Sequence, residues 1–331
     1  MTVLWLALLP LVSPAAPLTF GDGPRMNQIQ VIGTHNSYHK RPKSLSTAVK
    51  VNQEAKAWDY EHLPLDIQLD NRVRSLELDL HNTPEGWQVF HVPMFDQETS
   101  CREFTGCLNL VKAWSGAHPR HVPISFLMEH KDEGPRLTPR ITMPNAADLD
   151  RLDADIRSVF PREQIITPDD VRGDFATLEE AVLKRGWPSL ESARGKVFFI
   201  FHEIEELRDL YTRDRPSLQG RMMFVRSRPG RPDAAAMVCD NPYDPDIPDL
   251  VRRGYWIRTT AGGPGRRGLE AANQRRDRAL ECGAQIVSSD YPPGEPHAET
   301  GYVVALPGGV PVRWNPVCPP PDISFYPEAS P

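Results

Sequence analysis

Oxygen-bearing side chains at the ends of three apolar runs have the composition of a metal site. They belong to Asn36, Glu77, Asp79 and Glu129. Because side chains alternate along a strand, Glu77 and Asp79 point to one side and Leu78 to the other. Oxygen donors without a thiolate suit Ca²⁺ or Mg²⁺ better than Zn²⁺, and three carboxylates favour Ca²⁺. The alternative for Glu77 and Asp79 is the solvated face of an edge strand.

Two histidines near these runs have the chemistry for proton transfer. His35 immediately precedes Asn36, and His91 lies in the short strand-like segment 88–92 that follows the second run. A base and an acid beside a metal-bound phosphate would suit phosphoryl transfer. Asp290 ends the last apolar run, and in a closed barrel it would lie near His35 and could orient the ring. A turn aspartate is the alternative interpretation of Asp290.

Two cations complete the candidate site. Lys131 and Arg258 lie at predicted strand ends and could bind phosphate or polyol oxygens, or they could be ordinary rim charges. We interpret most of the other histidines as hydrogen-bonded surface residues, for example His39, His62, His118 and His121.

These residues need a scaffold that brings distant strand ends together. Runs rich in apolar and β-branched residues predict strands at 28–34, 74–80, 123–130, 196–202, 221–225, 235–239, 254–260 and 284–290. Amphipathic helices are predicted between them: one begins near Asn145, one starts at the capping box of Thr177 and stops at Gly186, and one covers 269–282. This alternation predicts a single TIM-like (β/α)₈ barrel with its active residues at the C-terminal strand ends. An open doubly wound sheet is the second choice, but no glycine-rich phosphate loop follows the first strand.

Composition and charge exclude several classes of protein. The 331 residues are 40% hydrophobic with a formal net charge of −6, which argues against nucleic-acid binding and against a polybasic membrane anchor. The N-terminal run VLWLALLPLV is too short to span a bilayer, and with the following SPAAP it predicts a secretory signal peptide at 1–16. A buried strand or a misplaced start is the alternative. We therefore expect a secreted monomer with a catalytic domain at 17–315, a proline-rich tail at 316–331 and no transmembrane segment.

Five cysteines without a CxxC pair make a zinc site improbable. In an exported protein disulfides are permitted, and Cys101 and Cys107 close a short loop that makes them the best pair. The odd number leaves at least one thiol unpaired.

The ordered set of motifs resembles the phosphatidylinositol-specific phospholipase C superfamily, and within it the secreted, Ca²⁺-dependent microbial branch. The resemblance rests on IGTHNSY around His35, VRSLELD around Glu77, the Glu129-His-Lys motif, and GYWIR and AQIVSSDYP near the end. It covers about residues 28–292. One departure is the glycine-rich segment TTAGGPGRRG after Arg258, where a more acidic sequence is expected, and it leaves head-group specificity open.

This resemblance implies cleavage of phosphatidylinositol on the diacylglycerol side of the phosphate. His35 would be the general base for the inositol 2-hydroxyl, and His91 would assist the leaving oxygen. Ca²⁺ on Asn36, Glu77, Asp79 and Glu129 would bind the phosphate. Two alternatives are a glycerophosphodiester phosphodiesterase, whose Glu-Asn-Thr motif is missing here, and a non-catalytic lipid-binding barrel, which would have lost the base or the ligands.

Overall fold

Eight parallel strands form the centre of the molecule. The computed structural model describes residues 17–21, 23–131, 134–265 and 267–322. The strands follow the order β6-β5-β4-β2-β1-β9-β8-β7. A parallel bridge between Arg226 and Ala236 joins the two ends of this sheet, so the strands form a nearly closed barrel. The predicted TIM-like barrel is therefore confirmed, and each predicted strand has its counterpart: β1 (Ile29–Thr34), β2 (Ser75–Thr83), β4 (Ile124–His130), β5 (Val197–Phe201), β6 (Met223–Val225), β7 (Ala236–Val238), β8 (Trp256–Thr260) and β9 (Ile286–Ser289).

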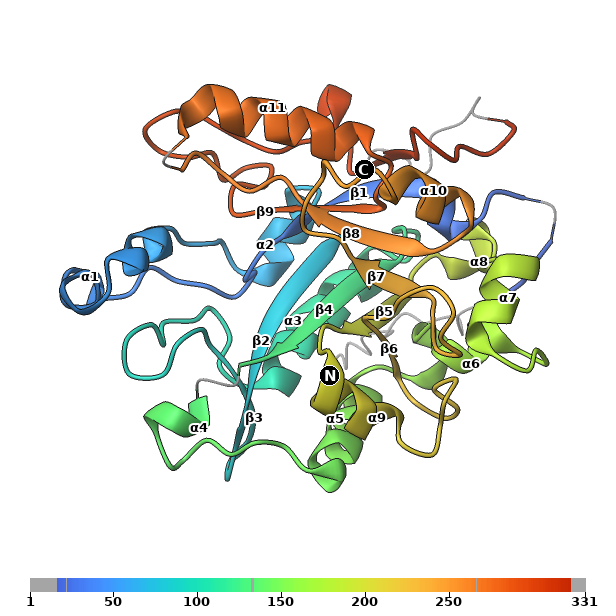
Figure 1. Cartoon of the computed structure of the whole chain (residues 1–331), viewed down its shortest axis with the longest axis horizontal. Coiled ribbons are helices and arrows are strands. Elements are labelled where there is room, and N and C mark those ends of the chain that lie inside the picture. Colours follow the sequence, from blue (N-terminus) through green and yellow to red (C-terminus); the bar gives the residue numbers. More distant parts are fainter. Residues whose placement is uncertain (1–16, 22, 132–133, 266, 323–331) are drawn as a thin grey trace, which may run out of the picture.

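Helices connect most of the strands and pack outside the barrel (Figure 1). The predicted helix after Asn145 is α5, and the Asn145 side chain accepts hydrogen bonds from the backbone N–H groups of Ala147 and Asp148. No helix separates β6 from β7 in residues 226–235, all of which are described. The helices are α1 (Leu45–Val51), α2 (Leu65–Asp70), α3 (Phe104–Ala117), α4 (Gly134–Leu137), α5 (Ala146–Val159), α6 (Pro168–Arg172), α7 (Leu178–Lys184), α8 (Leu190–Ala193), α9 (Glu205–Thr212), α10 (Ile247–Arg252) and α11 (Gly268–Glu281).

Two short antiparallel strands and four 3₁₀ turns lie outside the eight parallel strands in the described part of the chain. β3 (Gly86–Val89) forms an antiparallel hairpin with β2, and β10 (Val312–Trp314) pairs antiparallel with the first half of β1. Short 3₁₀ turns are η1 (Met26–Gln28), η2 (Gln53–Trp58), η3 (Arg162–Gln164) and η4 (Pro307–Gly309). The segment containing α1 projects to the left in Figure 1.

The core explains why the strands could be found in the sequence. All residues of β1, β5 and β9 are buried, because one face lines the barrel and the other meets the helices. Strands buried on both faces appear in a sequence as continuous apolar runs. Cys101 and Cys107 form the predicted disulfide at the start of α3, and the other three cysteines, all in the described part of the chain, have free thiols.

Two sequence-based expectations concern the chain ends. The predicted signal peptide at 1–16 lies outside the described residues. Within the described ranges, none of the helices combines the length and the apolar character that crossing a bilayer would require. At the other end, Asn315 donates to the carbonyl of Gly283 at 2.6 Å and Val317 packs against the same glycine, so the start of the proposed tail is held on the barrel.

Candidate active site

Strand register brings the predicted carboxylates together at the mouth of the barrel. β2 and β4 pair in parallel with Asp79 opposite Glu129, and β1 lies on the other side of β2. The hydroxyl of Ser37 accepts the backbone N–H of Glu77 at 2.8 Å, which fixes the loop after β1 to β2. Glu77 and Asp79 are both buried. Glu77, Asp79 and the partly exposed Glu129 therefore lie on one side of neighbouring strands, as the alternation along β2 predicted. β2 continues to Thr83, so Glu77 and Asp79 lie within this strand rather than at its predicted end.

The two predicted cations contact these carboxylates. Lys131 Nζ lies 3.1 Å from Asp79 Oδ2 and 3.0 Å from Glu129 Oε1. Arg258, in the middle of β8 rather than at its end, donates from Nη2 to Glu77 Oε2 at 2.7 Å and also pairs with Asp240. We call Glu77, Asp79, Glu129, Lys131 and Arg258 the mouth cluster; its three carboxylates against two cations give a formal charge of −1.

Asn36 supplies the observation that tests whether a metal ion fits. Its side-chain Oδ1 lies 3.3 Å from both carboxylate oxygens of Asp79, while its Nδ2 donates to Tyr60 at 3.2 Å. An amide oxygen facing two carboxylate oxygens requires either a reversed amide or a cation between them. Burial raises the pKa of Asp79 to about 6, against the opposing effect of Lys131, so a further positive charge would stabilise its ionised form. The oxygen donors and the net negative charge thus fit a hard cation such as Ca²⁺.

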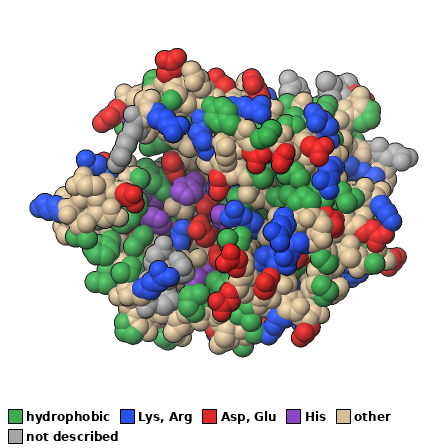
Figure 2. Space-filling view, in the orientation of Figure 1, with side chains coloured by type: hydrophobic (Ala, Val, Ile, Leu, Met, Phe, Trp, Pro, Cys, Tyr) green, Lys and Arg blue, Asp and Glu red, His purple; other side chains and the backbone are tan. Residues whose placement is uncertain are grey.

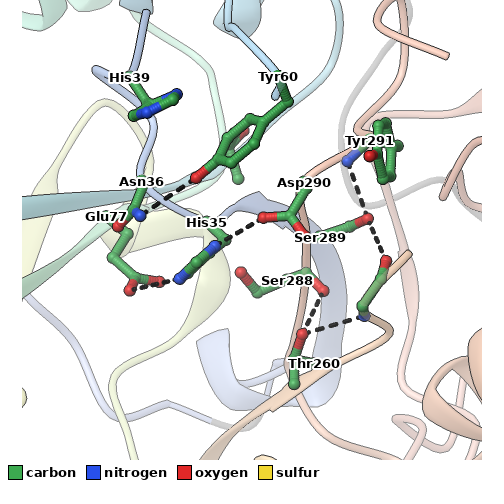
Figure 3. A network of polar contacts seen from close by, with 12 residues as sticks. His35, Asn36, His39, Tyr60, Glu77, Thr260, Ser288, Ser289, Asp290 and Tyr291 are labelled. Atoms are coloured by element: carbon green, nitrogen blue, oxygen red, sulfur yellow. Dashed lines mark hydrogen bonds and ion pairs between the residues drawn. The ribbon is translucent and has the colours of Figure 1, made fainter. Parts of the chain in front are cut away.

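His35 lies between two carboxylates at the edge of the mouth cluster (Figure 3). Its Nδ1 donates to Asp290 Oδ1 at 2.6 Å, and its Nε2 lies 3.8 Å from Glu77 Oε1. Burial disfavours the charged ring, but Glu77 and Asp290 outweigh it and raise the pKa of His35 to about 9. The side chain is 38% exposed, so a substrate can reach Nε2. Asp290 thus contacts His35 as expected for strands that adjoin in a closed barrel.

His91 lies in the turn that follows β3, two residues beyond the end of that strand rather than within it. Its Nδ1 donates to Asp96 Oδ2 at 2.7 Å, and the same oxygen accepts His39 Nε2 at 2.9 Å. The interpretation of His39 as a surface residue is therefore wrong, because this ring is fully buried against Asp96 and stacks on Tyr60.

The surface interpretation fails for two further histidines. His62 is buried, with its ring bonded to Glu295 at 2.6 Å and to the carbonyl of His35 at 3.0 Å. His121 is also buried and contacts Ser115 at 2.7 Å. Sequence alone could not find the partner of His62, because Glu295 is 233 positions away in the chain.

His202 and Glu203 extend the acidic region along β5. His202 Nδ1 lies 3.8 Å from Glu129 Oε2, and Glu203 Oε1 accepts the backbone N–H of His130 at 2.6 Å. Glu77, Glu129 and His202 also place three potential ligand atoms within 4.8 Å of one another. The sequence analysis did not include these two residues. His202 is the last residue of the predicted strand 196–202 and Glu203 follows it, so the rule that active residues lie at strand ends would have found both. Tyr60 and Asp96 lie in loops and carry no such signal.

A cleft of about 1070 Å³ is lined in part by Tyr60, His62 and Asp290, and Asp290 is the residue that holds His35. Its walls are the segment between β1 and α2, the glycine-rich loop after β8, and the segment after β9. Figure 2 shows histidine and acidic side chains in the hollow beside the projecting α1 segment. The glycine-rich loop is shaped by Tyr291, because a Cβ on Gly263 would lie 2.2 Å from its ring. The unexpected glycine at 263 thus allows the loop to pack closely against the cleft wall.

Comparisons with known proteins agree with this architecture. The described barrel is similar to a Ca²⁺-dependent phosphatidylinositol-specific phospholipase C from Streptomyces antibioticus, with 21% identity over 81% of this chain and 95% of that one and a TM-score of 0.57. A calcium-dependent phosphoinositol-specific phospholipase C from a Gram-negative Pseudomonas species shares 18% identity over 91% of this chain and 99% of that one, with a TM-score of 0.59. None of the curated proteins matches the chain significantly. The model of the family described as phosphoinositide phospholipase C, Ca²⁺-dependent, matches residues 24–88 and 83–316. The chain therefore belongs to the Ca²⁺-dependent phosphoinositide phospholipase C family.

Proposed function

We propose that this chain cleaves phosphatidylinositol into diacylglycerol and an inositol cyclic phosphate by acid–base catalysis at the barrel mouth. The observation that carries the proposal is His35, partly exposed and held by Asp290 directly beside the buried oxygen donors of the mouth cluster. A bound head group could therefore present its hydroxyl to the ring and its phosphate to the mouth cluster together.

His35 Nε2 is the atom available for the first proton transfer, because Nδ1 donates to Asp290. The ring would take the proton from the inositol 2-hydroxyl as that oxygen forms its bond to phosphorus. His91 would give a proton from Nε2 to the diacylglycerol oxygen as the phosphorus–oxygen bond breaks, because its Nδ1 is bonded to Asp96. Lys131 and Arg258 would orient phosphate or inositol oxygens from the floor of the site.

Asn36, Glu77, Asp79 and Glu129 would hold the calcium ion. Bound there, Ca²⁺ would neutralise phosphate charge and lower the pKa of the attacking hydroxyl. The parallel pairing of β2 with β1 and β4 places these four residues on neighbouring segments, with Asp79 opposite Glu129.

Secretion, membrane contact and a monomeric state form part of the proposal. The Cys101–Cys107 disulfide supports an oxidising compartment, as expected for an exported protein. The substrate would be taken from a membrane surface without a transmembrane anchor. Export of the full-length chain would test secretion, and sedimentation of the mature protein would test the monomeric state.

The decisive experiment measures hydrolysis of phosphatidylinositol vesicles with calcium and with a chelator. We expect activity in calcium, loss in chelator, and recovery when calcium is restored. Glycerophosphoinositol serves as the alternative substrate, and preferential turnover of it would overturn the proposed lipid specificity. Turnover of phosphatidylinositol that persists in chelator would overturn the metal requirement.

A matched pair of variants tests the ligand assignment by direct binding. Asp79→Asn should weaken calcium binding, measured by calorimetry, by at least about tenfold, since one carboxylate ligand is lost. Asp214→Asn makes the same change at an exposed turn after α9 and should leave binding unaltered. Equal affinities in the two variants would remove Asp79 from the ligand set.

A further inference from the structure

A buried histidine–carboxylate–histidine cluster lies behind His91. Asp96 Oδ2 accepts hydrogen bonds from His91 Nδ1 at 2.7 Å and from His39 Nε2 at 2.9 Å. His39 and Asp96 are fully buried, whereas the His91 side chain is 16% exposed. His91 is therefore the member of this cluster that solvent can reach.

The backbone builds this cluster and holds it in place. The N–H of Asp96 donates to the carbonyl of Val92 at 2.8 Å, and the N–H of Val92 donates to the carbonyl of Asp96 at 2.9 Å. This closed turn returns Asp96 to His91. On the other side, His39 stacks on Tyr60 with ring centroids 4.3 Å apart, and its backbone carbonyl accepts the N–H of His62 at 2.9 Å. The carboxylate is thus clamped between two rings with little freedom to turn.

The distances within the cluster indicate hydrogen bonds rather than a metal site. Two atoms bound at ~2.0–2.1 Å to one tetrahedral zinc ion lie roughly 3.3 Å apart. Both nitrogen–oxygen distances here are shorter, at 2.7 and 2.9 Å. Burial opposes ionisation of Asp96, but the hydrogen bonds from His39 and His91 outweigh it and lower its pKa. Asp96 is accordingly an anion that accepts two N–H groups.

We propose that Asp96 is the positioning residue of His91 and that His39 holds Asp96 in place for this task. A carboxylate on Nδ1 fixes the tautomer and orientation of an imidazole and stabilises its protonated form. Nε2 then carries the proton that the leaving oxygen needs. The inference rests on the proposed function, because it takes His91 as the acid of that reaction.

His35 and His91 would thus each be held by a carboxylate, but the two carboxylates differ in how many imidazoles they contact. Asp290 contacts His35 at the rim of the cleft, with no second imidazole bonded to it among the described residues. Asp96, in contrast, accepts hydrogen bonds from both His91 and His39. Replacing His39 should therefore leave the Asp96 carboxylate in place but hold it, and with it the His91 ring, less firmly.

Leaving-group dependence separates a positioning role from a structural one. Phosphatidylinositol expels an alkoxide, which needs a proton from an acid, whereas a nitrophenyl inositol phosphodiester expels a stable phenolate that does not. For Asp96→Asn we expect kcat on phosphatidylinositol to fall about 10²–10³-fold while kcat on the nitrophenyl substrate falls less than about fivefold. KM should stay unchanged for both substrates.

Two companion variants complete the comparison. In His39→Leu, kcat on phosphatidylinositol should again fall more than kcat on the nitrophenyl substrate, but by less than in Asp96→Asn. In His39→Gln, whose amide can donate to Asp96, most of the kcat on phosphatidylinositol should be restored. Equal losses on both substrates in Asp96→Asn and His39→Leu would show that the cluster is only structural and would overturn the inference.

His91→Ala separates failure of this inference from failure of the proposed function. If His91→Ala is selective for the alkoxide substrate and Asp96→Asn is not, the positioning role is wrong and the acid assignment stands. If kcat of His91→Ala falls equally on both substrates, the assignment of His91 as the acid is itself wrong.

A measurement on the unaltered protein avoids any folding defect of the variants. Nitrogen-15 shifts of labelled histidine should show neutral His91 protonated at Nδ1, since that atom donates to Asp96. Protonation at Nε2 with a bare Nδ1 would overturn the inference.

Discussion

Two partly buried ionic clusters of this molecule differ in how their charge is balanced. The mouth cluster has three carboxylates against two cations. Outside the barrel, a second group, here called the helix cluster, lies between α5, α9 and the start of β6. It consists of Asp150, Asp153, Tyr211, Arg213 and Arg221. Arg221 pairs with both aspartates, and Arg213 adds a second cation on Asp150, so this group has two of each sign.

The hydrogen bonds show the same contrast. In the helix cluster both oxygens of Asp153 have protein donors, the hydroxyl of Tyr211 at 2.6 Å and Nη1 of Arg221 at 3.2 Å. In the mouth cluster, Asp79 Oδ2 accepts the hydroxyl of Tyr38 at 2.7 Å and lies 3.1 Å from Lys131 Nζ, whereas Oδ1 faces the Asn36 amide at 3.3 Å. A cluster that is balanced by its own residues stabilises the fold, whereas one with excess negative charge is suited to bind a cation.

The largest expected effect is on chemistry at the mouth. His35→Ala should lower kcat on phosphatidylinositol by about 10³-fold, because the ring is the proposed base. Its thermal midpoint should stay close to that of the wild type, since the ring is partly exposed. Steady-state kinetics and thermal unfolding measure both, with His118→Ala as the control histidine variant. Activity near wild type would remove the base assignment.

The helix cluster should respond in the opposite way. Arg221→Met leaves Asp153 buried without its cation and should lower the free energy of unfolding by about 3 kcal/mol. Calcium affinity and kcat of the folded fraction should not change. Urea denaturation and calorimetry measure these quantities. A weakened calcium affinity in this variant would break the distinction between the two clusters.

Glu203, next to the mouth cluster, gives a pH-dependent prediction. Burial is the main reason why its pKa is raised from 4.5 to about 7. Between pH 4.5 and 7, Glu203 has lost its proton in the unfolded chain but keeps it in the folded protein. The free energy of unfolding of the wild type therefore falls as pH rises from 4.5 towards 7 and then levels off. Glu203→Gln should therefore be more stable than wild type at pH 8, by about 2 kcal/mol after allowance for partial exposure, and equal to it at pH 4. Unfolding in chelator measures this difference, and a variant less stable than wild type at pH 8 would contradict it.

The smallest expected effect is a shift of the His35 titration. Without calcium its pKa is about 9, because Glu77 and Asp290 favour the charged ring. A cation on Glu77 should lower this pKa by about one unit or more, which brings the ring towards the neutral form that a base requires. Nuclear magnetic resonance titration with and without calcium measures the change. An unaltered value in saturating calcium would place the ion away from Glu77.

Much of the fold was predictable because its signals are local. The eight strands are buried on both faces or nearly so, which leaves apolar runs in the sequence. Asn36 follows β1 and Glu129 lies at the end of β4, as predicted, whereas Glu77 and Asp79 lie within β2, which continues to Thr83. Asn145 and Thr177 marked helix starts through their own capping hydrogen bonds. β10 was missed, because it is three residues long and its pairing with β1 joins opposite ends of the chain.

The part of the site that escaped prediction depends on distant partners. His39 and Asp96 are 57 positions apart, and His62 bonds to Glu295 across 233 positions. Nothing in the neighbouring residues distinguishes these histidines from His118. Lys131 and Arg258 were recognised as candidate cations, but their pairing with Glu77, Asp79 and Glu129 followed only from the closed barrel.

The sequence by itself determined the strand runs, the order of the site motifs and the oxygen character of the donor set, because these follow from side-chain alternation and residue type. Only the tertiary structure decided which histidines are buried, which carboxylate serves each ring and how the charge at the mouth is balanced. Those properties depend on burial and on contacts between segments far apart in the chain, and both exist only once the barrel has closed.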